Sequence, residues 1–450
     1  MIKKPAKRHI GFKFYCVFFL CAPGFLGCAP QSNSSEKATK IQLPTRPATN
    51  ADVFSRNILN QNDPRVSYCE ILENNTASYT GVRDTQLEPL ASLSKVITSA
   101  WAMDTRGLDS RFASEWYLKP VSGLNGIFDA YLRTNYDPVV NTEKLLYFMS
   151  ELKALGVTGL RELVIDETTR VYISVLSAPH LELKETPVSS DESKDNLKLL
   201  FNSKNWASRT LKAKDNLQKW AAQNRRALNI PSSFSVEQVV VKNSAQINKD
   251  SYSNKKIILS APLFKYLKNM NVFSNNYLAD ALFESFGGAS AFKNFQKNTL
   301  KISTQDLQIY TGSGLPVNEA NDRKDNLGSC FSMIRVLSYV KQVSAQAQFN
   351  LGHLLLNPTS DQDGTFETQI DYGNSVVLKT GRLFDNPAFN LAGFVATEKG
   401  TLSFVFLGHD FTNMEAHDIE NMRSEMLNDI YRNYSTSSDF VTLSEYDIFL

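Results

Sequence analysis

Three short polar motifs, widely separated and in a fixed order, constrain this chain more than any other feature of its sequence. They are Ser92-Leu93-Ser94-Lys95, Ser274-Asn275-Asn276 and Lys379-Thr380-Gly381. Residues three apart share one face of a helix, so the Lys95 ammonium can reach the Ser92 hydroxyl. A neutral lysine beside a serine is a general base beside a nucleophile.

Each motif alone is weak evidence, because Ser92 and Lys95 also fit a helix cap followed by a solvated lysine. The settings of the motifs add information. The first opens a helix expected over 92–103, the second precedes one expected over 277–286, and the third ends a strand expected over 375–378. In this order and in these settings, the motifs resemble the signature of penicillin-binding proteins and serine β-lactamases.

The resemblance extends beyond the motifs to longer segments. These are Pro89-Leu90-Ala91-Ser92, Ser260-Ala261-Pro262-Leu263, Gly312-Ser313-Gly314-Leu315 and Phe389-Asn390-Leu391-Ala392-Gly393-Phe394. They are similar to segments of the class C low-molecular-mass penicillin-binding proteins, the D-alanyl-D-alanine carboxypeptidase/endopeptidase family. The similarity covers 66–173 and 259–431 well, and the residues between them poorly.

Strand-like and helix-like segments are mixed without a regular βαβ rhythm, which favours an α+β fold over a doubly wound one. Helical spacing of apolar residues predicts further helices at 144–155, 211–228 and 416–431. Short apolar runs predict strands at 66–72, 391–395 and 402–407. The charged, Ser-rich stretch 189–198 predicts a surface loop.

The distance between the first two motifs predicts an insertion. Ser274 follows Ser92 by 182 residues, which is too many for an undivided transpeptidase-like domain. The resemblance implies an antiparallel sheet flanked by helices, made from two halves and split by an inserted smaller domain. The expected limits are 52–115 and 255–435 for the DD-peptidase domain, 116–254 for the inserted domain and 436–450 for a C-terminal tail.

The inserted domain and the C-terminal tail each lead to a further expectation. Larger members of the family nest a further small domain in the insert. Here 174–208 is short, charged and poorly matched, so we expect that nested domain to be missing or vestigial. The tail mixes aromatic residues with acids, and docking on the body, contact with a partner or membrane, and disorder all stay open for it.

The resemblance also implies a role for each motif residue, in a reaction without a metal or an organic cofactor. Ser92 attacks the carbonyl between two D-alanines of a peptidoglycan stem peptide or cross-link, and Lys95 accepts its proton. Ser274 relays a proton to the leaving amine, and Asn276 holds Lys95 and the substrate amide. The remaining substrate contacts are expected from Lys379, Thr380, Gly381 and the main chain of Arg382. β-Lactams would acylate the same serine as inhibitors.

Arg382 is the main departure from the family pattern, because Ser or Thr is usual there. Its guanidinium could add a carboxylate contact, obstruct the cleft or turn to solvent. Thr311 stands where an acid is common, and Pro316 stands where Ser is common. These departures bear on substrate preference more than on the fold.

The N-terminus has the pattern of an export signal. Residues 1–27 carry five basic residues and no acid, and an apolar run over 14–26 is too short for a spanning helix. The run ends at Gly27-Cys28, which resembles the lipobox of bacterial lipoproteins. Residues 1–27 are therefore a predicted lipoprotein-type signal, Cys28 a predicted lipidation site, and 28–51 a predicted polar tether. Ordinary cleavage to an unanchored periplasmic protein is the alternative.

Removal of the leader together with lipidation of Cys28 would leave Cys69 and Cys330 as one possible disulfide, which spacing alone cannot decide. The other 423 residues carry 43 basic and 46 acidic groups, a balance that makes nucleic acid an unsuitable main partner.

Two His-Asp pairs, His409-Asp410 and His417-Asp418, could suggest a metal site. The polar end of a strand and the polar start of a helix explain them better.

Two other functions remain open from the sequence. A β-lactamase would use the same serine, but no acid that could activate water for deacylation is identifiable. A non-catalytic cell-envelope binding protein on the same fold is suggested by Arg382 and the altered Gly312-Ser313-Gly314 surroundings. The sequence does not choose between carboxypeptidase and endopeptidase activity.

Overall fold

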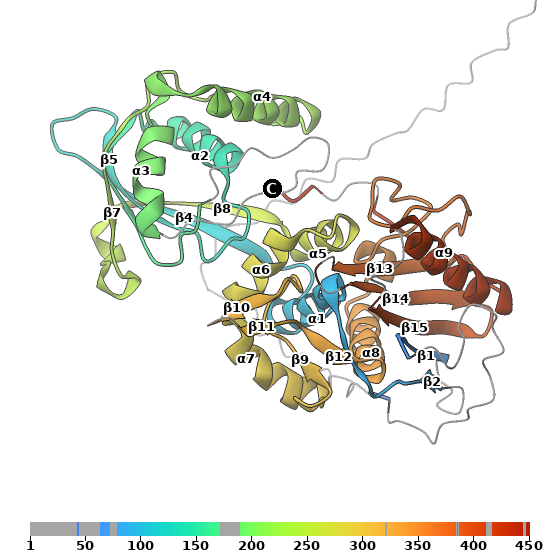
Figure 1. Ribbon diagram of the computed structural model, residues 1–450. Coiled ribbons are helices and arrows are strands. Elements are labelled where there is room, and N and C mark those ends of the chain that lie inside the picture. Colours follow the sequence, from blue (N-terminus) through green and yellow to red (C-terminus); the bar gives the residue numbers. More distant parts are fainter. Residues whose placement is uncertain are drawn as a thin grey trace, which may run out of the picture. The chain divides into compact units, whose positions relative to one another are not determined.

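The computed structural model describes residues 43–44, 64–72, 79–171, 190–319, 322–383, 385, 387–410, 416–443 and 447–450 (Figure 1). The expected signal, Cys28 and nearly all of the expected tether lie outside these residues. Within the described ranges, no helix has the length and apolar character needed to cross a membrane.

A five-stranded antiparallel sheet, in the order β13-β14-β15-β1-β2, forms the first part of the fold. Its strands are β1 (Val66–Leu72), β2 (Thr80–Val82), β13 (Val376–Leu383), β14 (Ala388–Thr397) and β15 (Gly400–His409). All of β14 is buried, because both faces of the sheet are covered. Since β1 pairs with β15, segments from both ends of the chain build one sheet.

Alternate residues of β13 enter different cores, as the two-residue period of a strand requires. Val377 belongs to a large cluster that includes residues of α1 (Ser94–Arg106) and α8 (Cys330–Gln346). Val376 and Leu378 belong to a second cluster with Met426, Leu427 and Ile430 of α9 (Ala416–Asn433). The helices α1 and α8 therefore cover one face of the sheet and α9 covers the other (Figure 1).

Several smaller elements surround α1. The helices are α5 (Leu263–Val272), α6 (Asn276–Ser285) and α7 (Gly288–Phe295). The short strands are β3 (Leu87–Pro89), β9 (Leu307–Gln308), β10 (Val317–Glu319), β11 (Asp322–Lys324) and β12 (Leu327–Ser329). The order β3-β12-β9 forms one small sheet, and β10-β11 forms a hairpin.

A second five-stranded sheet, in the order β7-β6-β5-β4-β8, is built from residues between the first two motifs. Its strands are β4 (Arg111–Pro120), β5 (Ile127–Arg133), β6 (Gly159–Ile165), β7 (Val236–Val241) and β8 (Asn254–Pro262). The helices of this part are α2 (Thr142–Ala154), α3 (Ser190–Leu200) and α4 (Ser208–Gln223). Trp116 of β4 is fully buried and packs edge-on against Phe148 and Phe201. The chain then runs from β8 directly into α5.

Two predictions about local structure are wrong. The described residues of the expected loop at 189–198, which are 190–198, lie in α3, because Leu197 and Leu200 are buried and give this charged segment an apolar face. The third motif does not end its strand, since β13 continues beyond Gly381 to Leu383 and pairs with β14 throughout. The described residues of 174–208 contribute α3, a turn at 203–205 and the start of α4, and no strand.

Two long-range connections were left open by the sequence, and the structure makes both. Cys69 of β1 and Cys330 at the start of α8 form a disulfide. Ile448 and Phe449 of the C-terminal tail are buried. Phe449 packs against Trp220 of α4, with ring centroids 4.7 Å apart, so the tail docks on the body.

Candidate active site

Ser92 lies in a 3₁₀ turn (Ala91–Leu93) that leads into α1. Ala91 has a positive φ of 49°, a conformation that a non-glycine residue rarely adopts. The surroundings hold it there: a Cβ on Gly314 would lie 1.9 Å from the Ala91 carbonyl oxygen. Asn390 of β14 donates from Nδ2 to the carbonyl oxygens of Pro89 (2.8 Å) and Leu90 (3.0 Å). The turn that carries Ser92 is therefore tied to the large sheet.

The Lys95 ammonium is fully buried and donates three hydrogen bonds. Its acceptors are Ser92 Oγ at 2.9 Å, Asn276 Oδ1 at 2.7 Å and the Ser313 carbonyl oxygen at 2.9 Å. Burial lowers the pKa of Lys95 to about 7, against the opposing charge of Asp280. A substantial neutral fraction near pH 7 gives this amine the state that a general base requires.

Ser274 and Asn276 face the Ser92–Lys95 pair from the start of α6. Ser274 also has a positive φ, 53°, so a sharply turned residue begins the second motif, as Ala91 directly precedes the first. The Asn275 side chain caps α6 by accepting from the Leu278 backbone N–H at 3.0 Å. This cap fixes the helix start, while Asn276 Oδ1 holds Lys95.

Lys379 is the second buried ammonium of the site. It donates to Ser274 Oγ at 3.0 Å and to the Thr380 carbonyl oxygen at 2.8 Å. Burial, reinforced by the charges of Lys95 and Arg423, holds the pKa of Lys379 well below its ordinary value. Four hydroxyl and amine groups of the motifs thus form two serine–lysine pairs, Ser92 with Lys95 and Ser274 with Lys379.

Thr380 and Gly381 are the other motif residues of β13. Thr380 Oγ1 lies 2.7 Å from Thr365 Oγ1. A Cβ on Gly381 would lie 3.0 Å from the Leu90 carbonyl oxygen and 3.0 Å from Asn390 Cβ. The absence of a side chain at 381 lets β13 approach the turn that carries Ser92.

Arg382 forms an ion pair with Glu420 of α9, with Nη1 2.9 Å from Oε1. Its guanidinium also lies over the Phe389 ring. The side chain is therefore held against α9, which removes the expectation that it turns to solvent. Thr311, the second departure, accepts from the Gly314 backbone N–H at 3.2 Å and donates to the Leu315 carbonyl at 2.8 Å. These bonds shape the loop that supplies the Ser313 carbonyl.

The structure thus brings together the seven predicted site residues of the three motifs, with Arg382 beside them on β13, and adds others whose roles the sequence interpretation did not predict. Asp280 accepts from the Ser313 backbone N–H at 2.7 Å, and Asn326 donates to Ser94 Oγ at 2.9 Å. Burial raises the pKa of Asp280 above its ordinary value. No role was predicted for Asp280, Asn326, Thr365 or Asn390, although Asn390 lies in a segment that resembles the family, because each acts on a residue that is distant in sequence.

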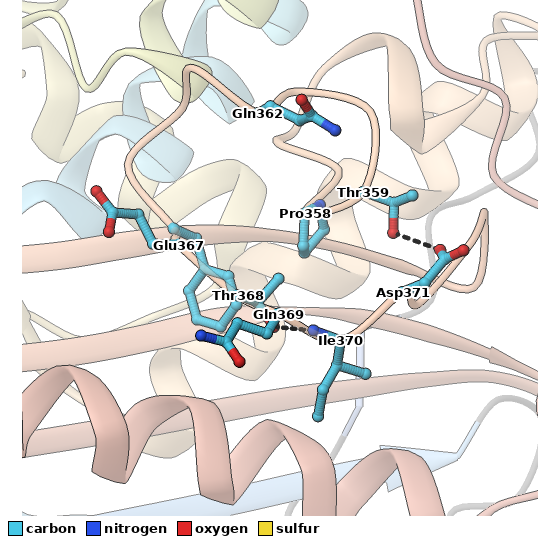
Figure 2. Close-up of a pocket in the computed structure, with 9 residues that line it drawn as sticks. Pro358, Thr359, Gln362, Glu367, Thr368, Gln369, Ile370 and Asp371 are labelled. Atoms are coloured by element: carbon cyan, nitrogen blue, oxygen red, sulfur yellow. Dashed lines mark hydrogen bonds between the residues drawn. The ribbon is translucent and has the colours of Figure 1, made fainter.

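A pocket of about 430 Å³ lies beside the loop that carries Thr365, and polar side chains line much of it (Figure 2). Thr359 donates to Asp371 at 3.1 Å, and the Ile370 backbone N–H donates to Thr368 at 3.0 Å. Ser92 does not line this pocket. No group of three His, Cys, Asp or Glu residues suited to a metal occurs among the described side chains, and His409 lies 2.6 Å from Glu88.

A serine hydroxyl hydrogen-bonded to a buried lysine, on an antiparallel sheet flanked by helices, is the arrangement expected of a serine acyl-transfer enzyme of the penicillin-binding type. Comparison with known families agrees. The model of the D-Ala-D-Ala carboxypeptidase 3 (S13) family matches residues 67–173 and 228–430, more than half of the chain. The protein belongs to this family and is a serine DD-peptidase.

Solved structures with the same fold share less than a quarter of their residues with this chain. The predatory endopeptidase Bd0816 from Bdellovibrio bacteriovorus has a TM-score of 0.74 and 23% identity, covering 85% of this chain and 98% of its own. Penicillin G-acylated Bd3459 from the same organism, in complex with immunity protein Bd3460, has a TM-score of 0.71 and 24% identity. The match covers 85% of this chain and 97% of that one. Penicillin binding protein 4 from Haemophilus influenzae has a TM-score of 0.51 and 17% identity, and the match covers 81% of this chain and 96% of that one. No curated protein sequence matches the chain.

Proposed function

We propose that Ser92 is the nucleophile of this DD-peptidase and that the enzyme cleaves D-alanyl bonds of peptidoglycan stem peptides or their cross-links. One observation carries the proposal: Lys95 Nζ lies 2.9 Å from Ser92 Oγ, and its pKa is lowered to about 7. A serine hydroxyl is a weak nucleophile unless a base takes its proton. Lys95 is that base.

Acylation moves one proton at each end of the broken bond. Ser92 Oγ attacks the D-alanyl carbonyl carbon while its proton passes to Lys95, and backbone N–H groups of Ser92 and Arg382 stabilise the oxyanion. The carbon–nitrogen bond then breaks, and Ser274 relays a proton: its hydroxyl proton passes to the leaving amine, and the proton held by Lys95 replaces it, so that Lys95 is neutral again for hydrolysis. Lys379, 3.0 Å from Ser274 Oγ, supports this transfer. Water later hydrolyses the ester and restores the Ser92 hydroxyl.

The substrate is held on both sides of the reacting bond. Asn276 orients Lys95 and binds the substrate amide, while Lys379 and Thr380 receive the terminal carboxylate. Gly381 allows the substrate backbone to lie against β13. The Bdellovibrio relatives are described as endopeptidases, one of them acylated by penicillin G, which supports cross-links as substrates and β-lactams as inhibitors.

Labelling with a fluorescent penicillin tests this assignment. The wild-type protein is expected to form a stable adduct at Ser92, and Ser92→Ala is expected to form none, because the hydroxyl is the acylated atom. Digestion of muropeptides would then distinguish release of terminal D-alanine from cleavage of cross-links. Absence of an adduct on folded wild-type protein would instead favour a non-catalytic binding protein, and rapid turnover of penicillin would favour a β-lactamase.

We also propose that the protein is exported and held at the cell envelope through a lipid on Cys28. The basic and apolar leader at 1–27 supports this, as does membership of a family that acts on peptidoglycan. Metabolic palmitate labelling is expected for the wild type and not for Cys28→Ala. Unlabelled wild-type protein in the periplasm would contradict the anchor but not export.

The division into a DD-peptidase domain (52–115 and 255–435) and an inserted domain (116–254) is part of the same proposal. The separate sheet formed by β4 to β8 supports it, although the proposed limits fall within β4 and at the start of β8.

A further inference from the structure

A buried arginine beside the proposed carboxylate position has no role in the mechanism above. Arg423 of α9 is only 4% exposed, and its Nε atom donates no hydrogen bond within the described part of the chain. Burial lowers the pKa of Arg423 to about 10. Since a buried charge is costly unless an opposite charge or hydrogen bonds compensate for it, this guanidinium is suited to receive an anion.

The position of Arg423 points to the substrate rather than to solvent. It lines a small pocket of about 80 Å³ whose other lining residues are Gly364, Thr365, Phe366, Glu367, Glu420 and Ser424. Thr365 Oγ1 lies 2.7 Å from Thr380 Oγ1, so the pocket adjoins the hydroxyl proposed to bind the terminal carboxylate. The charge of Arg423 also helps to lower the pKa of Lys379, which places the two cations near each other.

The alternation of β13 explains this proximity. Leu378 packs in the cluster that includes α9 residues, and Thr380 and Arg382 follow it at intervals of two. These side chains therefore project toward the face covered by α9, on which Arg423 lies. Lys379 and Gly381 project toward the opposite face, where Ser274 and the turn carrying Ser92 lie.

Two carboxylates in the same pocket could compete for Arg423. Glu420 accepts from Arg382 Nη1 at 2.9 Å, so one of its oxygens is already bound, although its charge still acts on Arg423. Glu367 is exposed to solvent, where water screens its charge. Arg382, the main departure from the family pattern, thus engages the acid whose charge acts on Arg423.

We propose that Arg423 is a specificity-determining residue that binds the terminal carboxylate of the acyl donor together with Thr380. The proposal rests on the function proposed above. Charge-assisted hydrogen bonds to a carboxylate are shorter and stronger than neutral ones. Arg423 would therefore favour substrates and β-lactams that carry a free carboxylate over those in which it is blocked.

Acylation by benzylpenicillin and by its methyl ester, followed by mass spectrometry of the intact protein, tests this directly. The ester has one additional methyl group, which removes the carboxylate charge. In Arg423→Gln we expect the benzylpenicillin rate to fall about 10- to 100-fold, the range for loss of a hydrogen bond to a charged group. The ester rate should change less than about threefold, because the lost contact is one that the ester does not make.

Two further variants keep the test decisive. Arg423→Lys retains the charge and should show an intermediate ratio of the two rates; this ratio decides the matter if Arg423→Gln does not fold. Arg432→Gln, an exposed arginine of the same helix, should leave both rates within about twofold of wild type. Equal loss with both reagents, or no loss with benzylpenicillin, would overturn the proposal. Failure of wild-type protein to react with either reagent would instead refute the proposed function.

Discussion

At the scale of single residues, two lysines occupy buried positions that an ordinary ammonium would avoid. Lys95 and Lys379 are both 0% exposed, and the charge of Lys95 lowers the pKa of Lys379. Desolvation is the largest cause of the lowered pKa in each, and hydrogen bonds to serine hydroxyls give each lysine a defined partner. The fold thus supplies a neutral amine at a pH where a free lysine would be fully protonated.

The lowered pKa of Lys95 predicts how acylation depends on pH. Protonation removes the base, so the rate of penicillin acylation should fall about tenfold for each pH unit below 7 and level off above about 8. Stopped-flow measurements with a fluorescent penicillin, together with thermal unfolding at each pH, would check this. A flat profile between pH 5 and 9 on folded protein would contradict the role of Lys95.

At the scale of elements, the site depends on contacts between segments that are distant in sequence. Asn390 of β14 holds the turn before α1, and the Ser313 carbonyl reaches Lys95 from a loop. The Cys69–Cys330 disulfide adds a covalent link between β1 and α8, 261 positions apart. Because α8 and α1 cover the same face of the large sheet, this link supports the face on which Ser92 lies.

Removal of the disulfide should therefore lower stability without removing the site. The double variant Cys69→Ala/Cys330→Ala is expected to lose about 2–4 kcal/mol of unfolding free energy, the usual cost for a native disulfide. Denaturant titration would measure the loss, and reduction of the wild type should reproduce it. Identical unfolding curves for oxidised wild type and the double variant would contradict this.

At the scale of the whole molecule, the C-terminal tail connects the two sheet-containing parts. It follows α9, which packs on the large sheet, and it ends against α2 and α4 of the inserted segment. Along the way, Phe440 N–H donates to the Asn374 carbonyl at 2.9 Å, and Asn350 donates to the Asp439 carbonyl at 2.8 Å. Trp220 Nε1 donates to Asp447, whose pKa is raised by burial.

This docking predicts a stabilising role for Phe449, which is 2% exposed. Phe449→Ala should cost about 3 kcal/mol, typical of a phenylalanine removed from a core, and should lower the melting temperature. Penicillin acylation below that temperature should be unchanged, since the aromatic partners of Phe449, Tyr147 and Trp220, lie outside the site. Val441→Ala, at a 59% exposed position of the same tail, is the matched control. Equal melting temperatures for the two variants would contradict the role.

Much of this protein is readable from local sequence patterns. The strand 66–72 was predicted with the bounds of β1, and the helix 416–431 is two residues shorter than α9, because apolar spacing is a local property. The order of the three motifs predicted the α+β penicillin-binding fold, which the family match confirms. The segment α3 was missed because its charged composition hides the two buried leucines, Leu197 and Leu200.

The rest depends on which distant residues meet in the folded chain. Lys95 and Asn276 are 181 positions apart, and Arg382 reaches Glu420 from a neighbouring element. No local pattern marks Thr365 or Arg423, and the segment that contains Asn390 does not reveal its role, because each residue acts on a side chain or carbonyl that folding brings to it. The sequence by itself determines the chemical type of each residue and the spacing between residues. Burial arises only when the elements pack. It lowers the pKa of Lys95 and leaves Arg423 Nε without a hydrogen bond among the described residues.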